Sequence, residues 1–306
     1  MSAPAKATVS VPATSANLGP GFDAFGLALD ARDRFEAEAA DEWSVEVVGE
    51  GEDTLARDEG NLVVVAAKRA FEAAGVKSAA RIRCENRIPV GRGLGSSAAA
   101  IVGGLLLASA LSGAGMSRRE LLDLAAGIEG HADNVAAALL GGFVIVRRED
   151  DGIEAERFEP GGGIAVVAAL SDRELATADA RRALPETVPH ADAAANAGRA
   201  ALFALGIAGC RRDLVRAGAS DFLHERYRAE LIPDAEDTRQ ALLEAGADAA
   251  VLSGAGPTML GIFVGVSDLE ALERAHDASA RLRLPVGRKA LVVGVDCRGA
   301  YLDVTS

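Results

Sequence analysis

A glycine-rich segment, PVGRGLGSSAA at residues 89–99, carries the clearest chemical signal in the sequence. Its alternate glycines, Gly91, Gly93 and Gly95, allow positive φ and a close approach of the backbone to a ligand. Two serines follow at the expected start of an apolar helix, where N–H groups are unpaired and the helix dipole is positive. The segment predicts a phosphate-binding loop, although a tight turn before a buried helix has the same composition. It lacks the GK[ST] ending of a Walker A loop, and a serine replaces the third glycine of the dinucleotide fingerprint.

Three other segments combine polar side chains with glycines or with a helix start. Residues 251–258 (VLSGAGPT) place two glycines after an expected strand, where an ordinary β-turn is the simpler interpretation. Residues 13–23 hold Asn17 and Asp23 in a glycine-rich loop, and such side chains usually cap turns. Glu129 and the HADN string at 131–134 fit a site for a cation or a substrate, or equally a solvated helix start. Taken singly, none of the three distinguishes ligand binding from local structure.

Taken together, the four segments match in order and approximate spacing the pattern of the GHMP kinases, the superfamily of galactokinase, homoserine kinase and mevalonate kinase. Residues 89–99 resemble the ATP-binding motif of that group, and residues 253–258 resemble its C-terminal glycine motif. Within the group the chain most resembles the homoserine kinases. Three strings carry this likeness: PATSANLGPGFDAFGLAL at 12–29, HADNVAAALLGG at 131–142 and TADARRALP at 177–185.

The resemblance covers most of the chain, from about residue 7 to beyond residue 260. It implies an α+β fold, the two-domain GHMP kinase fold, with ATP and substrate bound between the domains. The N-terminal domain would be an α/β domain of the ribosomal-protein type, and the C-terminal domain would be ferredoxin-like. The implied reaction is the phosphorylation of L-homoserine by ATP, which gives ADP and O-phospho-L-homoserine on the way to threonine.

ATP and Mg²⁺ are the cofactors that the resemblance implies. Its nucleotide-binding residues would be Pro89, Val90, Gly91, Arg92, Gly93, Leu94, Gly95, Ser96, Ser97, Ala98 and Ala99, with Asn61 near the base. Ser97 would also contact the Mg²⁺, and Glu129 is the expected second metal ligand. Glu129 lies only two positions before His131, where the family has several more residues. Asp123 on the preceding helix is therefore an alternative ligand, and an impaired metal site is a third.

Homoserine presents an ammonium, a carboxylate and a hydroxyl, and the resemblance assigns partners to the first two. Asp23 would bind the ammonium, with Asn17 beside it. Arg181 and Arg228 would bind the carboxylate, for which guanidinium groups offer a bidentate geometry. The match at Arg228 is the looser one, because Arg226 stands where the family has proline.

His131 and Asn134 match the substrate-side string and are the implied catalytic residues. In mevalonate-type relatives an aspartate near this place can act as a base. Here the residue is Asn134, which leaves Asp133 as the remaining candidate. We therefore expect the substrate hydroxyl to attack the γ-phosphate directly, with positioning and electrostatics supplying most of the acceleration.

Apolar spacing and turn residues predict the elements that position these segments. In the first half, a strand over 7–11 leads into a long loop over 12–26. Strands over 27–41 and 44–48 form a meander, and the remaining elements are a helix over 61–74, a strand over 81–86, helices over 96–110, 117–126 and 131–140, and a strand over 143–147. The second half has strands over 164–170, 250–252, 260–264 and 291–295 and helices over 192–205, 211–218 and 234–245. A charged stretch with a triple glycine predicts a boundary between domains of residues 1–155 and 156–306.

Composition limits the classes of function. The 306 residues are 49% hydrophobic and 25% charged, which excludes a mainly disordered chain. A net charge of −13 argues against nucleic acid as a partner, and the excess of arginine over lysine fits GC-rich codon usage, salt adaptation or both. Three distant cysteines predict neither a disulfide framework nor a zinc site. The N-terminus MSAPAKATVS lacks a secretory signal, and the apolar run 98–111 is too short to span a membrane. We expect a cytoplasmic protein, with a homodimer as a further expectation.

Other classes of function remain open at the level of sequence. A GHMP kinase for another small alcohol, such as mevalonate or shikimate, would have neither paired arginines nor a partner for an ammonium. A non-catalytic relative that binds a metabolite and regulates would explain the short segment before His131. A structural or interaction protein is the remaining alternative.

Overall fold

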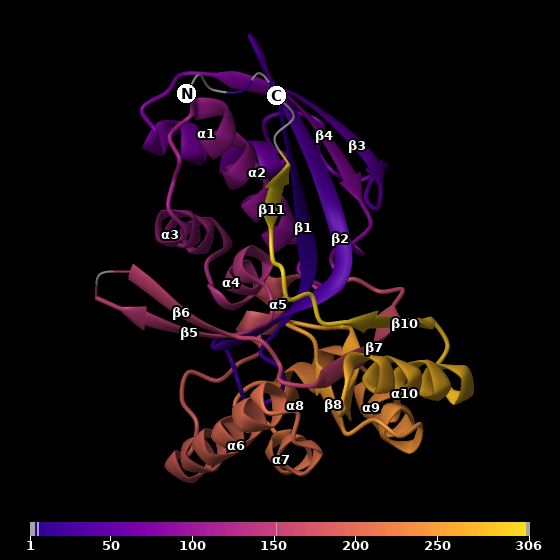
Figure 1. Cartoon of the computed structure of the whole chain (residues 1–306). Coiled ribbons are helices and arrows are strands. Elements are labelled where there is room, and N and C mark those ends of the chain that lie inside the picture. Colours follow the sequence, from indigo (N-terminus) through magenta and orange to yellow (C-terminus); the bar gives the residue numbers. More distant parts are fainter. Residues whose placement is uncertain (1–3, 5, 151, 304–306) are drawn as a thin grey trace.

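Two β-sheets with their helices lie one above the other in the computed structural model, which describes residues 4, 6–150 and 152–303 (Figure 1). The first sheet has the order β11-β1-β2-β4-β3, and β5 and β6 continue it from β2. Its strands are β1 (Lys6–Ala16), β2 (Phe25–Ala40), β3 (Ser44–Gly49), β4 (Ala79–Asn86), β5 (Phe143–Glu149), β6 (Gly152–Phe158) and β11 (Tyr301–Asp303). The second sheet, β10-β7-β9-β8, contains β7 (Gly163–Ser171), β8 (Ala249–Leu252), β9 (Met259–Gly265) and β10 (Arg288–Gly294). Of the N-terminal decapeptide discussed above, residues 1–3 and 5 lie outside the described residues.

Strand β1 extends further than the sequence predicted. It pairs antiparallel with β2 as far as Ala16, which lies opposite Gly26, and the register shifts between Pro12 and Ala13. A proline has no N–H to give to a ladder and is tolerated at such an irregularity. The expected loop over 12–26 is therefore wrong in its first part, and the loop proper is residues 17–24. Its two ends are fixed by paired strands, which restricts where its polar side chains can lie.

The predicted meander of β2 and β3 is also wrong. Strand β3 pairs with β4, in parallel, and β4 separates it from β2. Parallel neighbours need a long crossover connection, and α1 (Leu62–Ala73) with its flanking loops provides it. The same crossover brings residues 55–63 to the end of the sheet where the functional site is found.

Four helices cover one face of the first sheet: α1, α2 (Ser96–Ser112), α3 (Arg118–Glu129) and α4 (Asp133–Leu140) (Figure 1). Helix α2 packs against α1, α3, α4, β1 and β2, which explains why its sequence is apolar on nearly every side. The capping box predicted for α3 is confirmed, since Ser117 accepts from the N–H of Glu120 and the Glu120 carboxylate accepts from the N–H of Ser117.

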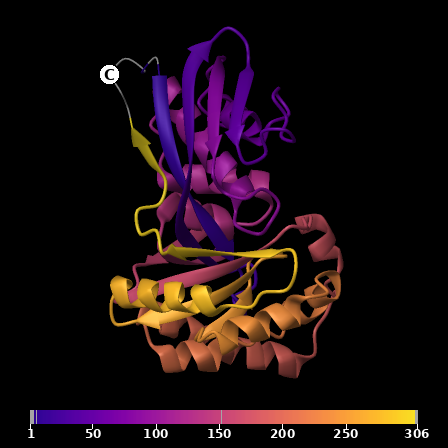
Figure 2. The ribbon, with the colours of Figure 1, turned by 90° about the vertical axis from the view of Figure 1, so that its right-hand side faces the viewer.

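The second half adds helices around the second sheet. They are α5 (Thr177–Arg182), α6 (His190–Ala208), α7 (Arg212–Gly218), α8 (Glu225–Arg228), a 3₁₀ turn (Ala229–Leu231), α9 (Ala235–Glu244) and α10 (Asp268–Arg281). Helix α10, which packs on β7, β9 and β10, was not predicted from the sequence. Figure 2 shows the last part of the chain running from β10 back along the first sheet, where β11 pairs with β1.

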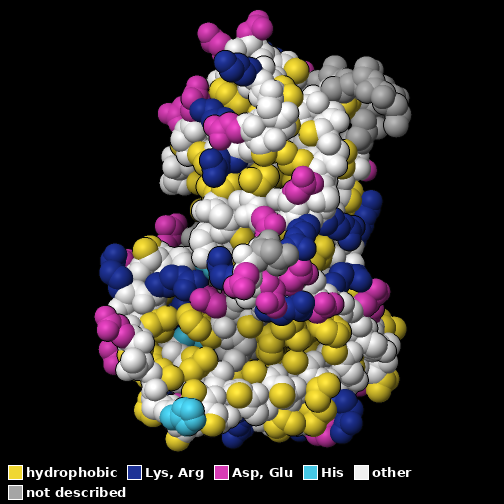
Figure 3. All heavy atoms as spheres, turned by 90° about the vertical axis from the view of Figure 1, so that its left-hand side faces the viewer, with side chains coloured by type: hydrophobic (Ala, Val, Ile, Leu, Met, Phe, Trp, Pro, Cys, Tyr) yellow, Lys and Arg dark blue, Asp and Glu magenta, His cyan; other side chains and the backbone are white. Residues whose placement is uncertain are grey.

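One hydrophobic core is shared by the two halves. Buried side chains of the first sheet and its helices, such as Val9 and Ile101, belong to the same cluster as Phe203 of α6 and Val264 of β9. Figure 3 shows acidic and basic side chains interspersed across the middle of one face, while apolar side chains gather over its lower part. Within the described ranges, no helix combines the length and the apolarity that crossing a bilayer requires.

Candidate active site

A cavity of about 430 Å³ lies where the two halves meet. Its walls come from the β1–β2 loop, the loop before α1, the glycine-rich loop before α2, the start of α4, α5, α8 and the loop after β8. The predicted site residues that line it are Asn17, Asp23, Asn61, Val90, Gly91, Gly93, Gly95, Ser96, Ser97, Glu129, His131, Asn134, Arg181 and Arg228. Segments distant in the sequence thus meet around one space, as the resemblance implied.

Some residues of the predicted nucleotide motif do not line this cavity. They are Pro89, Arg92, Leu94, Ala98 and Ala99. Pro89, Leu94, Ala98 and Ala99 are buried, and the last three belong to the hydrophobic core beneath the loop. Their placement indicates support of the loop rather than contact with a ligand.

The glycine-rich loop adopts the backbone conformation that its sequence predicted. Gly91, Gly93 and Gly95 have φ of +68°, +81° and +71°. Gly95 is the N-cap of α2 and has no side chain to occupy the first-turn N–H groups of Ser96 and Ser97. Both serines line the cavity at the positive end of the helix dipole, a position that suits a phosphate group.

Ser97 and Glu129 meet at one wall of the cavity. The Ser97 hydroxyl donates to Glu129 Oε1 at 2.6 Å. Asp123 lies elsewhere, since its carboxylate accepts from the N–H of Ile153 at 2.8 Å and holds β6. No group of three His, Cys, Asp or Glu side chains among the described residues forms a metal cage. The hydroxyl and carboxylate oxygens suit Mg²⁺, which takes few protein ligands and completes its shell with phosphate and water oxygens.

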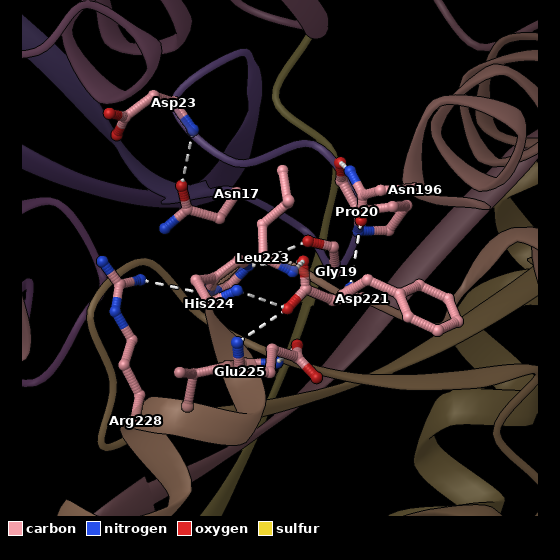
Figure 4. Close-up of polar contacts among 12 residues, drawn as sticks. Asn17, Gly19, Pro20, Asp23, Asn196, Asp221, Leu223, His224, Glu225 and Arg228 are labelled. Atoms are coloured by element: carbon pink, nitrogen blue, oxygen red, sulfur yellow. Dashed lines mark hydrogen bonds and ion pairs between the residues drawn. The ribbon is translucent and has the colours of Figure 1, made fainter. Parts of the chain in front are cut away.

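The β1–β2 loop presents Asp23 beside Asn17. Asn17 Oδ1 accepts from the Asp23 N–H at 2.9 Å (Figure 4). Its Nδ2 donates to Gly254 O at 2.8 Å. Arg181 of α5 donates to both Asp23 oxygens, at 2.7 and 3.0 Å. This hydrogen bonding raises the pKa of Arg181 further. The predicted ammonium partner and one predicted carboxylate partner are therefore bound to each other in this structure.

Arg228 is the largest fully buried side chain of the described structure, with 1% of its surface exposed. Its Nη1 donates to Gly254 O at 3.0 Å, and no carboxylate of the described residues lies within 4 Å of its guanidinium. Burial and the neighbouring Arg181 charge lower the pKa of Arg228. Asp23, Asp221 and Asp133 oppose this shift from a greater distance. A buried cation that lines a cavity with no carboxylate in contact suits an anionic ligand. Arg226, by contrast, is partly exposed and pairs with Asp192 outside the cavity.

The HADN string forms a compact polar cluster at the start of α4. His131 Nδ1 lies 2.7 Å from Asp133 Oδ1, and its Nε2 lies 3.9 Å from Glu129. Burial alone would lower the pKa of His131, but the hydrogen bond and charge of Asp133 and the charge of Glu129 outweigh burial and raise it. Asp133 Oδ1 also accepts from the Asn134 N–H at 2.8 Å, and Asn134 Oδ1 accepts from the Thr14 hydroxyl at 2.7 Å.

Asn61 has a structural function that its predicted role did not include. Its side chain caps α1, because Oδ1 accepts from the Val63 N–H at 3.1 Å and Nδ2 donates to Ala56 O at 2.6 Å. Sequence reasoning missed other residues that line the same end of the cavity, namely Asp33, Phe35, Leu55, Ala56, Leu62, Cys84 and Asn86. They come from strands β2 and β4 and from the loop before α1, and no local motif in the sequence singles them out.

Asp33 makes the free energy of unfolding depend on pH. It is buried, and its Oδ1 accepts from the N–H groups of Arg87 and Ile88 at 2.6 and 2.9 Å, just before the glycine-rich loop. Burial raises the pKa of Asp33 from 3.8 to about 6, although these two hydrogen bonds oppose the shift. Between pH 3.8 and about 6, Asp33 therefore keeps its proton in the folded state and loses it in the unfolded state. The contribution of this proton to the free energy of unfolding is complete below pH 3.8 and is lost as the pH rises through about 6.

We expect Asp33→Asn to remove this dependence. At pH 8 the variant should exceed the wild type in free energy of unfolding by about 1–3 kcal/mol, because the buried charge is gone. At pH 4 the two proteins should be nearly equal. Urea unfolding at both pH values measures the difference. A variant that is less stable at pH 8 would show that the ionised carboxylate holds the loop more strongly than burial penalises it.

Comparisons with known proteins agree with this geometry. The family model described as GHMP kinases N terminal domain matches residues 61–142, and the one described as GHMP kinases C terminal matches residues 198–282. The homoserine kinase of Streptomyces coelicolor is 45% identical over 283 residues, which are 90% of this chain and 91% of that protein. The homoserine kinase of Carboxydothermus hydrogenoformans is 41% identical over 83% of this chain and 84% of that protein.

Solved structures show the same relationship. A homoserine kinase from Cytophaga hutchinsonii superposes with a TM-score of 0.83 at 29% identity, over 99% of both chains. A mevalonate kinase superposes with a TM-score of 0.66 at 12% identity, over 94% of this chain and 99% of that one, and shares the fold. The two-domain fold, the ordered motifs and these relatives agree, so the chain belongs to the GHMP kinase family and, within it, to the homoserine kinases.

Proposed function

We propose that this chain transfers the γ-phosphate of ATP to the hydroxyl of L-homoserine, giving ADP and O-phospho-L-homoserine for threonine biosynthesis. The observation that carries the proposal is the composition of one cavity. Glycines and serines of the glycine-rich loop line it together with Asp23, Arg181 and Arg228. An α-amino acid offers an ammonium and a carboxylate to such a set, whereas mevalonate and shikimate have no ammonium.

Binding of homoserine exchanges ion-pair partners inside the cavity. Its ammonium would take Asp23 and its carboxylate would take Arg181 and Arg228, in place of the Asp23–Arg181 pair seen here. Each charge then keeps a partner, which limits the penalty of bringing a zwitterion into a partly buried site. An alcohol with only one of the two charges would separate the pair and leave one member without a partner.

A substrate panel tests this proposal. ADP release in the presence of ATP and Mg²⁺ should require L-homoserine and should stay at background with mevalonate or shikimate. Release with one of the other alcohols would assign the chain to a different GHMP kinase reaction. The absence of release with all three would favour a regulator that binds a metabolite without turning it over.

The residues at the reaction end favour direct transfer without a general base. Asp133, the one candidate base, already accepts from His131 and from the Asn134 N–H through the same oxygen. Asn134 cannot take a proton at neutral pH, and its oxygen is engaged by Thr14, which leaves its amide donors for the substrate or the γ-phosphate. The hydroxyl would lose its proton to a phosphate oxygen or to water as the new bond forms. The protein would contribute alignment and charge stabilisation.

We expect Asn134→Ala to lower kcat by about 100-fold, because one preorganised donor at the transferring group is lost. The KM for ATP should change little, since the glycine-rich loop is untouched. Steady-state kinetics of ADP release measure both values. A pH–rate profile of the wild type with an essential basic group assigned to Asp133 would contradict the mechanism, and Asp133→Asn provides that assignment.

Mg²⁺ would be held by Ser97 and Glu129, which already lie within hydrogen-bonding distance of each other. When bound, the ion neutralises charge on the phosphates of the nucleotide. Hydroxyl and carboxylate oxygens are hard ligands that fit this ion. In this proposal the β- and γ-phosphates would lie on the side of the cavity that carries Ser97 and Glu129.

We expect Glu129→Gln to raise the Mg²⁺ concentration needed for half-maximal activity by at least about tenfold, because an amide oxygen replaces a charged ligand. Asp123→Asn is the matched control on the same helix, and it should behave as the wild type because its oxygen still accepts from Ile153. A Mg²⁺ titration of both variants separates the two candidates. A higher Mg²⁺ requirement in Asp123→Asn alone would show that Asp123, and not Glu129, is the metal ligand.

Three further features belong to the same proposal. The organisation into two domains is supported by the separate sheets, but a boundary between residues 155 and 156 would divide β6, which belongs to the first sheet, and β11 also returns to that sheet. A cytoplasmic location is supported by three cysteines that are all free thiols. A homodimer is the proposed oligomeric state, and light scattering of the full chain tests it.

A further inference from the structure

The guanidinium of Arg228 contacts a buried imidazole that has no part in the proposed reaction. Arg228 Nη1 lies 3.2 Å from His224 Nδ1, four residues earlier in the chain (Figure 4). Both side chains are buried, His224 completely, and Arg228 lines the cavity whereas His224 does not. His224 therefore reaches a ligand only through Arg228.

The donors and acceptors around His224 define its tautomer. A guanidinium can only donate, so Nδ1 must accept from Arg228. The proton then resides on Nε2, which lies 2.8 Å from Gly19 O and 3.7 Å from an oxygen of Asp221. Both of these atoms are acceptors. A hydrogen on Nδ1 would oppose the arginine, so the contact requires the lone pair of Nδ1 to face Arg228.

The position of His224 is itself fixed from several sides. Asp221 accepts from the N–H groups of His224 and Glu225, both at 2.7 Å, and this places the imidazole at the start of α8. The ring of Phe22 stacks on the imidazole with a centroid distance of 5.2 Å. The same Phe22 ring lies 5.3 Å from the Arg228 guanidinium. An imidazole that stacks on Phe22 and is hydrogen-bonded at both nitrogens has little freedom to follow a moving arginine.

His224 also joins the two parts of the substrate site. Its Nε2–H contacts Gly19 in the β1–β2 loop, which carries Asn17 and Asp23, while its Nδ1 contacts Arg228. The carbonyl of Gly254 makes a parallel connection, because it accepts from both Asn17 and Arg228. The groups proposed for the ammonium and those proposed for the carboxylate are thus connected through His224, as Figure 4 shows, and through Gly254.

We propose that His224 is a positioning residue that aims the Arg228 guanidinium at the substrate carboxylate and keeps it in register with the β1–β2 loop. This inference rests on the proposed function, since it takes homoserine as the ligand of Arg228. It adds a specificity element that contacts no substrate atom and that acts only on substrates with a carboxylate.

The test compares two substrates in His224→Leu. L-Homoserine has the carboxylate, and 3-aminopropan-1-ol has the same ammonium and hydroxyl without it. We expect the KM for homoserine to rise about 10- to 100-fold, which is the range for a lost hydrogen bond to a charged group. The kcat and the KM for ATP should stay within twofold, and kcat/KM for 3-aminopropan-1-ol should be unchanged. His276→Leu, an equivalent change at an exposed position of α10, is the control.

Two conservative variants separate positioning from general stability. The amide oxygen of His224→Asn can accept from Arg228 in place of Nδ1, and the amide nitrogen of His224→Gln can donate to Gly19 O in place of Nε2. We expect the asparagine variant to keep more of the preference for homoserine over 3-aminopropan-1-ol than the glutamine variant. This comparison distinguishes a positioning role of His224 from a role in stability even if His224→Leu does not fold.

The proposal would be overturned if His224→Leu lost kcat/KM equally with both substrates, or if its KM for homoserine were unchanged. It would also be overturned if His224→Gln preferred homoserine over 3-aminopropan-1-ol more strongly than His224→Asn does. Failure of the proposed function has a different signature. The wild type would then show no turnover of homoserine above background, and the inference would fail with it before any variant is compared.

Discussion

Replacement of Arg228 by methionine should lower kcat/KM for homoserine by about 100- to 1000-fold, the range expected when one partner of a buried charge pair is removed. The side chain is buried, lines the cavity and has no carboxylate partner within 4 Å among the described residues. Burial and the neighbouring Arg181 charge lower its pKa. The KM for ATP should be unaffected, and the melting temperature should stay the same or rise, because an apolar side chain of similar length removes a buried cation.

Arg226→Met provides the matched control two residues away. Arg226 is partly exposed and donates to Asp192 at 2.6 Å, so the same chemical change there should leave homoserine kinetics near the wild type. Steady-state kinetics and thermal unfolding of both variants give the comparison. If Arg228→Met retains the homoserine KM of the wild type, the assignment of the carboxylate site is wrong.

The second large effect is expected at Gly95. A Cβ built on this residue would lie 1.9 Å from Thr14 Oγ1, and Gly95 has a φ of +71°. Thr14 cannot move aside freely, because its N–H donates to Leu94 O and its hydroxyl to Asn134. Gly95→Ala should therefore separate the loop from β1 and reduce ATP affinity by at least about 100-fold, as displacements of about 1 Å do in preorganised sites.

Gly75→Ala isolates the contribution of backbone strain. Gly75 follows α1 with a φ of +67°, and a Cβ there would meet nothing within 4 Å. We expect this variant to lose about 1 kcal/mol of stability and to bind ATP as the wild type does. Nucleotide binding by calorimetry measures both variants. Equal ATP affinity in Gly95→Ala and the wild type would show that the loop does not hold the phosphates.

The parts of the site that follow each other in the chain could be predicted from the sequence. The spacing of Gly91, Gly93 and Gly95 before two serines depends on local φ and on a helix N-terminus, and both are properties of neighbouring residues. The same holds for the capping box at Ser117. The long-range partners Asp23 and Arg181 were predicted through the resemblance, since their contact spans 158 positions in sequence and leaves no local pattern.

The predictions that were wrong or missing concern features that depend on strand pairing or on burial between segments distant in the sequence. The order of β3 and β4 is decided by the crossover through α1, and strand propensity carries no information about it. The extent of β1 past Pro12 depends on a register shift that only the partner strand defines. His224 and Asp33 belong to none of the glycine-rich motifs, and their importance appears only when Gly19, Arg228 and the N–H groups of Arg87 and Ile88 are brought to them.

The central claim is that ATP and homoserine occupy one cavity, and a bisubstrate inhibitor tests it most directly. The compound joins adenosine through a tetraphosphate to the hydroxyl oxygen of L-homoserine. Inhibition kinetics are measured against each substrate in turn. If the cavity between the glycine-rich loop and the Asp23–Arg181–Arg228 set holds both, inhibition is competitive with ATP and with homoserine alike. Competition with only one of them would contradict the shared site.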